Sequence, residues 1–332
     1  MSKKKIIILA TACAAIIGTC IVLWKVFAST TRIAFVNYQA ITLGQIAKAN
    51  DNSFVKLEEL PADELAKASR YDMVFVNGMG IRITAEQRHA LEEAAKNGTP
   101  VLTTAATNPD NHIVSVDSVD NEFLAQYLVG GRNNYRNMLR YVRRFVDSKK
   151  LFAPLPGDPE ISASSMLYYP GDNETLNFGS VAAYEAWLKK ADRWNDSAPR
   201  IILTGRMGVS DSLIARLEQT GNIVYPVNVI QTLIKGGHAD SIHASAVINM
   251  AHGRMGDQVT RWLESENIPL FAPVNANRDY DEWLADKMGM NGGFLSQSIV
   301  TPEIDGAIRP YTLFAHFTGS DGLPYVEAIP DR

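Results

Sequence analysis

Cysteine is almost absent from this sequence: there are two, Cys13 and Cys20, and both lie within the first 28 residues. The rest of the chain therefore cannot form a disulfide framework, a CxxC redox pair or a cysteine-based metal site. No HExxH motif occurs and the six histidines are scattered, which argues against a prebuilt zinc site. Neither a GxGxxG turn nor a P-loop occurs, so nothing indicates that the chain itself binds ATP or a dinucleotide. Signatures of serine or cysteine nucleophiles are missing too, which disfavours a hydrolase.

Basic side chains are also fewer than acidic ones. The chain has 32 Lys and Arg against 36 Asp and Glu, a formal net charge of −4. All charges in the first 28 residues are lysines, so the remainder carries 28 basic against 36 acidic side chains, or −8. An acidic body argues against bulk electrostatic binding to nucleic acid, and we expect no nucleic-acid partner.

One long uncharged run lies near the amino terminus. After three consecutive lysines, Lys3–Lys5, it extends over nineteen residues from Ile6 to Trp24. A helix needs ~20 apolar residues to span a bilayer, and flanking lysines favour a cytoplasmic amino end. The run therefore predicts a single transmembrane anchor in the inner (cytoplasmic) membrane, with the body facing the periplasm. Cleavage after Ala28 as a signal peptide stays open, and a lipid on Cys20 is a weaker alternative.

Strand-like and helix-like patterns alternate from Arg32 onward and restart at Arg200. Such alternation predicts an α/β fold, with two doubly wound, flavodoxin- or Rossmann-like halves and a helical, loop-rich middle, preceded by one transmembrane helix. The predicted parts are the anchor or signal segment (1–28), a first α/β domain (29–120), a connector (121–195) and a second α/β domain (196–332).

Three segments carry sharper structural predictions. Thr84–Lys96 is a helix, because Thr84 is a capping residue with Gln87 three positions later. Residues 151–178 are rich in Pro, Gly, Ser and Asn and predict a connecting loop. The pattern over Ser241–Met250 predicts a strand.

Glycine turns follow three of the predicted strands. The tetrapeptide GRMG occurs twice, at Gly205–Gly208 and Gly253–Gly256, and Gly78–Gly80 ends an earlier strand. Ligands of doubly wound sheets bind beyond the carboxyl ends of the strands. Arg206 and Arg254 are therefore candidates to bind a carboxylate or phosphate. The residues leave open that glycine only permits tight turns there.

His252 stands directly before the second GRMG turn. A neutral imidazole at a strand end could ligate a metal or move a proton near pH 7, so His252 is a candidate metal ligand and catalytic residue. A purely structural histidine is the alternative.

A basic stripe lies on the predicted helix over Arg132–Val146. Its arginines recur at four-residue steps and include Arg136 and Arg140, which we take as candidates for binding the carboxylates of a ligand or anionic lipid. The alternative is a solvated face whose arginines pair with neighbouring carboxylates.

Two carboxylates, Glu303 and Asp305, flank Ile304 in the stretch TPEIDGAI. If this stretch is extended, both point the same way and one pKa can rise for acid–base work. They are candidate catalytic residues, and an Asp-Gly turn with a solvated glutamate is the alternative.

The second half resembles a known family. The resemblance is carried by four stretches in order: PRIILTGRMGVSDSLIARLEQTGNIVYPV, SIHASAVINMAHGRMG, IPLFAPVN and SQSIVTPEIDGAIRPYTLFAH. They are similar to the large subunit of cobaltochelatase and magnesium chelatase, the CobN family. The stretches GGRNNYRNMLRYVRRFV and YYPGDN resemble the membrane-anchored type from haem-uptake loci.

The resemblance implies a tetrapyrrole, haem or a relative, as ligand and a metal ion as substrate, with no covalently bound cofactor. Arg254 and Arg309 are then candidates for binding propionates, and His252 for the axial or metal position. Family members are far longer, so we expect a truncated member that lacks much of the catalytic part. An exported body would not meet ATP, which favours haem handling over ATP-driven insertion.

Two other functions stay open. The chain could be a non-catalytic, membrane-anchored scaffold that docks haem or cobalamin uptake proteins. It could also be an exported solute-binding lobe for another ligand, because fold does not determine function.

Overall fold

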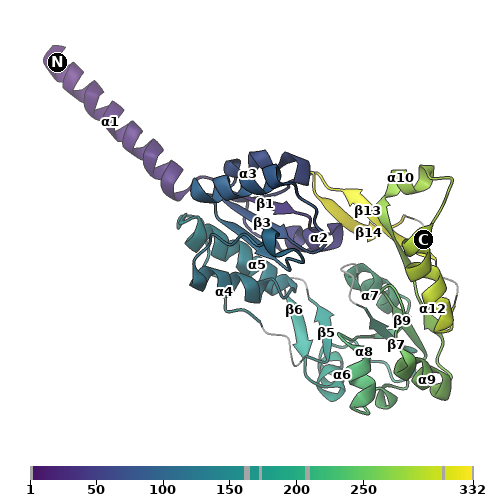
Figure 1. The fold of residues 1–332 in the computed structure, drawn as a ribbon. Helices are drawn as coiled ribbons and strands as arrows, with labels where there is room; N and C mark the ends of the chain where they lie inside the picture. Colours follow the sequence, from purple (N-terminus) through teal and green to yellow (C-terminus); the bar gives the residue numbers. More distant parts are fainter. Residues whose placement is uncertain (1–2, 161–164, 172–173, 206–209, 309–310, 331–332) are drawn as a thin grey trace. The chain divides into compact units, whose positions relative to one another are not determined.

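The computed structural model describes residues 3–160, 165–171, 174–205, 210–308 and 311–330 (Figure 1). The chain divides into two compact units. Unit 1 comprises residues 1–39 and 45–160, and unit 2 comprises residues 40–44 and 161–332. The expected connector, 121–195, is therefore shared between the two units.

Unit 1 is built on a parallel sheet of four strands in the order β2-β1-β3-β4. Continuous apolar runs form its central strands because a parallel sheet is covered on both faces. Ala34, Val36, Val74 and Val76 of these strands lie in its core. The elements are α1 (Lys3–Phe27), β1 (Thr31–Val36), α2 (Ala40–Ala49), β2 (Val55–Glu59), η1 (Ala62–Arg70), β3 (Met73–Asn77), α3 (Ala85–Lys96), β4 (Val101–Thr104), η2 (Pro109–Asn111), α4 (Ser118–Tyr127), α5 (Arg132–Tyr141) and η3 (Val142–Val146).

Unit 2 contains a five-stranded parallel sheet, a three-stranded sheet and a hairpin. The parallel sheet has the order β12-β10-β9-β7-β8, and the smaller sheet has the order β11-β13-β14. Its elements are β5 (Leu167–Pro170), β6 (Thr175–Phe178), α6 (Val181–Lys190), β7 (Arg200–Thr204), α7 (Ser210–Gln219), β8 (Ile223–Pro226), α8 (Ile230–Lys235), η4 (Asp240–Ile242), β9 (Ala246–Asn249), α9 (Asp257–Glu266), β10 (Leu270–Phe271), β11 (Val274–Asp279), α10 (Tyr280–Ala285), α11 (Gly292–Leu295), η5 (Ser296–Val300), α12 (Thr301–Ile304), β12 (Ala307–Ile308), β13 (Thr312–Thr318) and β14 (Pro324–Ala328).

The structure confirms an α/β fold with parallel sheets and corrects local details. Helix α3 begins as predicted: the Thr84 hydroxyl accepts from the Gln87 amide, and the Gln87 side chain accepts from the Thr84 amide. The loop expected over residues 151–178 contains the antiparallel hairpin β5–β6. The strand expected over Ser241–Met250 is wrong in its first half, where a 3-10 turn ends at His243 in a left-handed conformation. Such a backbone cannot continue a strand.

The first helix, α1, covers the run in which the sequence predicts a membrane anchor. Within the described part of the chain, no helix combines the length and the apolar character that crossing a bilayer requires. The anchor stays a prediction.

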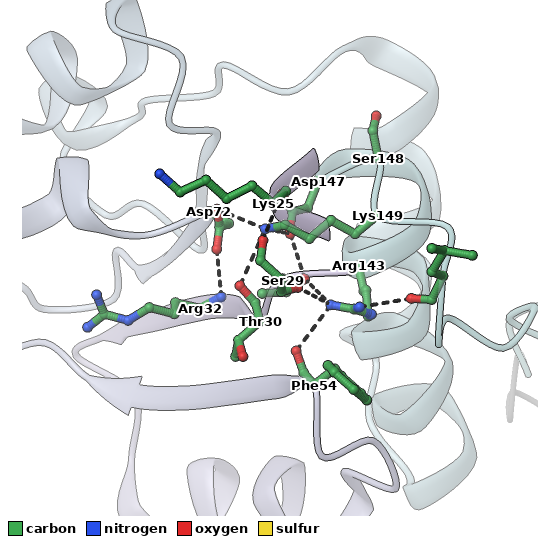
Figure 2. A network of polar contacts seen from close by, with 12 residues as sticks. Lys25, Ser29, Thr30, Arg32, Phe54, Asp72, Arg143, Asp147, Ser148 and Lys149 are labelled. Carbon is green, nitrogen blue, oxygen red and sulfur yellow. Dashed lines mark hydrogen bonds and ion pairs between the residues drawn. The ribbon is translucent and has the colours of Figure 1, made fainter. Parts of the chain in front are cut away.

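A buried arginine joins four segments of unit 1. The side chain of Arg143 is completely buried, and its guanidinium donates hydrogen bonds of 2.9–3.3 Å to five oxygens (Figure 2). Burial lowers its pKa, but carbonyl oxygens surround the charge. The acceptors are the carbonyls of Ser29, Phe54, Leu151 and Phe152 and the hydroxyl of Thr31.

A buried carboxylate completes this network. The Thr31 hydroxyl donates to Asp147 (2.5 Å), and the Lys149 ammonium donates to both Asp147 (2.7 Å) and Asp72 (3.4 Å). Burial raises the pKa of Asp147, while its bonds to Lys149 and Thr31 lower it. The first strand, the loop before β2 and the segment after η3 are thereby fixed to one another.

Arg143→Met should destabilise unit 1 strongly. The substitution removes all five hydrogen bonds that the buried guanidinium donates, and we expect a loss of about 3 kcal/mol in the free energy of unfolding. Hydrogen exchange of the β1 amides is the measurement. Arg82→Met, at an exposed position, is the matched control. Equal protection in both variants would show that the network does not stabilise the unit.

Candidate functional site

The strand order of unit 2 points to one edge of its parallel sheet. Numbered 1 to 5 along the chain, its strands are β7, β8, β9, β10 and β12. Across the sheet they lie in the order 2-1-3-4-5, as in flavodoxin-like sheets. Ligands of such sheets bind beyond the carboxyl ends, where the order reverses. In unit 2 this switch point lies between β7 and β9, and the second GRMG turn follows β9 directly.

Glycine at the end of β7 lets the loop after β9 approach closely. Gly205 has a φ of +73°, and a Cβ there would lie 2.4 Å from the Ala251 nitrogen and 2.4 Å from the Asn249 side-chain oxygen. No other residue fits without displacing the loop. Gly205 therefore has two structural roles. It permits the tight turn after β7, and it lets the ends of β7 and β9 lie close together at the switch point.

Asp305 holds the loop after β9 in place. It is 4% exposed, and its Oδ2 accepts from the Met255 amide at 2.6 Å. Its Oδ1 accepts from Nε of Arg254 at 2.7 Å and from the Thr260 hydroxyl at 3.3 Å. Both oxygens are thus committed to protein donors. This geometry favours a positioning role for Asp305 over the predicted role of proton carrier.

Arg254 keeps donors to spare. Its Nη2 donates to Asp257 at 2.9 Å, and its bonds to Asp305 and Asp257 raise its pKa, with the Asp305 bond contributing most. The side chain is 42% exposed. A guanidinium carries five N–H donors, so the ion pairs orient Arg254 while leaving N–H groups for a ligand carboxylate.

His252 lies two residues before Arg254 and is half-buried. Its Nδ1 lies 3.1 Å from the Ser298 hydroxyl of η5, and its ring meets Phe294 edge to face at 5.8 Å. Burial lowers its pKa, so the imidazole is neutral at pH 7. When Nδ1 donates to Ser298, the lone pair of Nε2 is available to a metal ion or a proton. Among the described residues, Nε2 has no hydrogen-bond partner.

The two carboxylates of TPEIDGAI do not share a face. The stretch is helical over Thr301–Ile304, so the extended geometry that would point both carboxylates the same way does not occur. Glu303 is exposed, whereas Asp305 follows the helix and is buried, with Gly306 at a φ of +79°. Glu303 and Asp305 both line a groove of about 500 Å³ between α9 and α12. No pair of neighbouring carboxylates is formed.

The predicted arginine stripe lies in unit 1, on α5 and η3. Arg140 is ion-paired with Asp51, and Nη2 of Arg136 donates to Asn133 at 3.1 Å. Arg143 is buried, and Arg144 donates to the Ala153 carbonyl at 2.8 Å. These contacts favour the structural alternative for the stripe. The candidates Arg206 and Arg309 lie outside the described residues.

Several residues that shape the site were missed by the sequence reasoning. Ser298 orients His252, and the Gln297 carbonyl accepts from the Gly253 amide at 2.8 Å. Gln231 of α8 donates to the Met255 carbonyl at 2.9 Å. The stretch SQSIV beside TPEIDG was the available signal for the first two. The contact with Gln231 has none, because it joins elements that are adjacent only in the fold.

Unit 1 has a comparable switch point, between β1 and β3. There the Asn37 side chain donates to the carbonyls of Asn77 (2.8 Å) and Met79 (3.1 Å). The side chain of Asn37 thus bridges the two strand ends. The chemistry-bearing side chains gather at the switch point of unit 2 instead.

The donor set does not amount to a resident metal centre. Nowhere in the described ranges do three or more His, Cys, Asp or Glu side chains gather to hold a metal ion.

These features describe an α/β protein with a candidate ligand site at a topological switch point. The model of the CobN/magnesium chelatase family matches residues 125–332. The chain therefore belongs to the CobN/magnesium chelatase family.

Comparison with solved structures shows a shared fold for one of them. The catalytic subunit of cobaltochelatase from Mycobacterium tuberculosis matches with a TM-score of 0.58 at 15% identity, covering 91% of this chain and 26% of that chain. This chain thus spans about a quarter of that subunit's length. A D-isomer-specific 2-hydroxyacid dehydrogenase from Lactobacillus delbrueckii ssp. bulgaricus matches with a TM-score of 0.28 at 12% identity, over 84% of this chain and 89% of that chain. No sequence match to a curated protein was found.

Asp305→Asn should destabilise unit 2. Asparagine cannot accept at both positions, so either the buried Met255 amide or Arg254 loses its acceptor, and we expect a loss of about 2–3 kcal/mol. Urea unfolding followed by tryptophan fluorescence reports on unit 2, which holds four of the five tryptophans. Asp257→Asn is the control, because Asp257 pairs with the same arginine but is exposed; a change within ~0.5 kcal/mol is expected.

His252 should make unit 2 less stable in mild acid. A pKa below the ordinary value of 6.5 means that the folded protein binds fewer protons than the unfolded chain. The contribution of His252 to the free energy of unfolding is therefore fully present above about pH 6.5, and it is lost as the pH falls through the pKa of His252 in the folded protein. His316, also with a pKa lowered by burial, acts in the same direction. His252→Gln should reduce the difference in unfolding free energy between pH 7.5 and pH 5.5 without abolishing it; an unchanged difference contradicts the assignment.

Proposed function

We propose that this chain binds a tetrapyrrole and takes part in inserting a metal ion into, or removing it from, a porphyrin or corrin, with haem as the favoured macrocycle. The carrying observation is the loop after β9. It presents a neutral His252 and a partly exposed Arg254, two residues apart, at the switch point of a chelatase-family sheet.

Arg254 and His252 would bind different parts of the tetrapyrrole. The spare N–H groups of Arg254 would bind a propionate, while its bonds to Asp305 and Asp257 hold the guanidinium in place. Nε2 of His252 would approach the macrocycle from its face, where it can bind the central metal or take a pyrrole proton. The metal ion is a substrate in this scheme, consistent with a single histidine rather than a prebuilt cage.

Ser298 and Asp305 act through these two residues. Ser298 orients the ring of His252, and when its hydroxyl accepts the Nδ1–H, the lone pair is on Nε2. Asp305 positions the loop through the Met255 amide. Glu303, exposed on the groove between α9 and α12, is the carboxylate with freedom to carry protons.

We also propose that residues 6–24 anchor the chain in the cytoplasmic membrane, with its body on the periplasmic side. The uncharged run after three lysines supports this location. A body without access to ATP favours metal removal or haem handling, in contact with haem or cobalamin uptake proteins. Because the chain spans 26% of the cobaltochelatase subunit, it would supply one part of the family's activity.

Spectral titration of the full chain with haem and with metal-free porphyrin tests this function. We expect saturable absorbance shifts with both ligands. His252→Ala should weaken haem binding about tenfold, because it removes the bond to iron, and should leave metal-free porphyrin within about twofold.

His89→Ala, an exposed histidine of α3, is the control and should change neither affinity. The circular dichroism of each variant reports its folding. A folded chain that binds neither ligand would overturn the proposal and leave the scaffold and the solute-binding lobe as the remaining functions.

A further inference from the structure

An apolar surface lies at the carboxyl end of α1. It consists of the side chains of Trp24, Phe27, Phe54, Leu151 and Phe152, here named the α1-base surface. Leu151 and Phe152 are 53% and 55% exposed, although both are large and apolar. Phe54 and Phe152 stack at 4.7 Å, and Trp24 lies 6.2 Å from Phe152 and 6.4 Å from Phe54.

The fold holds this surface in its exposed arrangement. Arg143 donates to the carbonyls of Leu151 and Phe152. It also donates to the carbonyl of Phe54, and its guanidinium lies 5.2 Å from the Phe54 ring (Figure 2). Phe152 has a φ of +53°, a conformation that bulky residues rarely adopt. The network that fixes unit 1 therefore also presents two apolar side chains to solvent.

Helix α1 enters the surface without a flexible linker. The Phe27 carbonyl accepts from the Leu151 amide at 3.1 Å, and Ala28 is completely buried. The first strand begins at Thr31, beside Arg143. If a membrane holds residues 6–24, it therefore also lies next to the α1-base surface.

The charges around this surface are positive. Lys25 and Lys150 are exposed beside Trp24 and Leu151, and Arg144 binds the Ala153 carbonyl. The acidic groups nearby are all paired with basic side chains: Asp51 with Arg140, and Asp72 and Asp147 with Lys149. Apolar aromatic side chains bordered by lysine and arginine are typical of surfaces at the level of lipid headgroups.

We propose that the α1-base surface contacts a bilayer containing anionic phospholipid, with Trp24, Leu151 and Phe152 at the headgroup boundary. Two observations select this occupant over a protein partner: the surface is continuous with the uncharged run, and its charge complements anionic headgroups. The proposal rests on the membrane location proposed above. It is independent of the tetrapyrrole site in unit 2.

Fluorophores attached to single cysteines test this contact in the full chain reconstituted into vesicles. The positions are native Cys20 in a Cys13→Ser chain, and Leu151→Cys or Met288→Cys in chains that also carry Cys13→Ser and Cys20→Ser. Met288, 83% exposed in unit 2, is the matched control. The readouts are emission wavelength and quenching by a lipid-borne nitroxide, in phosphatidylglycerol-containing and in pure phosphatidylcholine vesicles.

We expect blue-shifted, strongly quenched emission at positions 20 and 151, and solvent-like emission at 288. Quenching at 151 should be several-fold higher in anionic vesicles. Lys150→Glu should reduce it, while Lys190→Glu, at an exposed position of α6, should not.

Each other result overturns the proposal in a distinct way. Quenching at position 20 but not at position 151 would contradict the contact between the α1-base surface and lipid but would support the membrane anchor. Quenching at neither position removes both. A blue shift at 151 without lipid quenching, together with a cross-linked dimer, assigns the surface to a second copy of the chain. Circular dichroism shows whether each variant is folded.

Discussion

The loop after β9 keeps its shape because one buried carboxylate, Asp305, binds it. Its oxygens accept from the Met255 amide and the Arg254 side chain, fifty and fifty-one positions earlier in the sequence. A buried carboxylate must be fully hydrogen-bonded, so the segment after α12 and the loop after β9 can be stable only together. His252 and Arg254, the two side chains with chemistry to offer, lie on this loop.

The two units differ in which of their polar side chains are already bound by the protein itself. Both sheets begin with the same strand order, and both have a switch point where a ligand could bind. In unit 1 the Asn37 side chain bridges the two strand ends, and the arginines near α5 bond carboxylates and carbonyls of their own unit. In unit 2 the corresponding edge presents a neutral imidazole and a guanidinium with unused donors. These two groups are the ones that the proposed ligand requires, because a tetrapyrrole has carboxylates at its rim and a metal at its centre.

A single histidine is informative here. A protein that keeps a metal ion as a cofactor surrounds it with three or four ligands, whereas a protein that handles a metal already bound by a macrocycle needs one. Under the proposed function, His252, oriented by Ser298 and with a pKa lowered by burial, would supply that single ligand. The exposed Glu303 on the neighbouring groove provides a carboxylate that protein contacts do not immobilise.

The sequence by itself determined the α/β class, the capped helix after Thr84 and the candidates His252, Arg254 and Asp305, because periodicity, capping residues and strand-end glycines act over a few positions. It could not decide that Asp305 is buried, that Glu303 is exposed, or that Arg143 binds four carbonyls. These properties depend on contacts between elements far apart in the chain, such as Arg143 with Ser29 across 114 positions. The tertiary structure decided which charged side chains hold the fold and which face a ligand, because only packing determines which donors and acceptors are already satisfied.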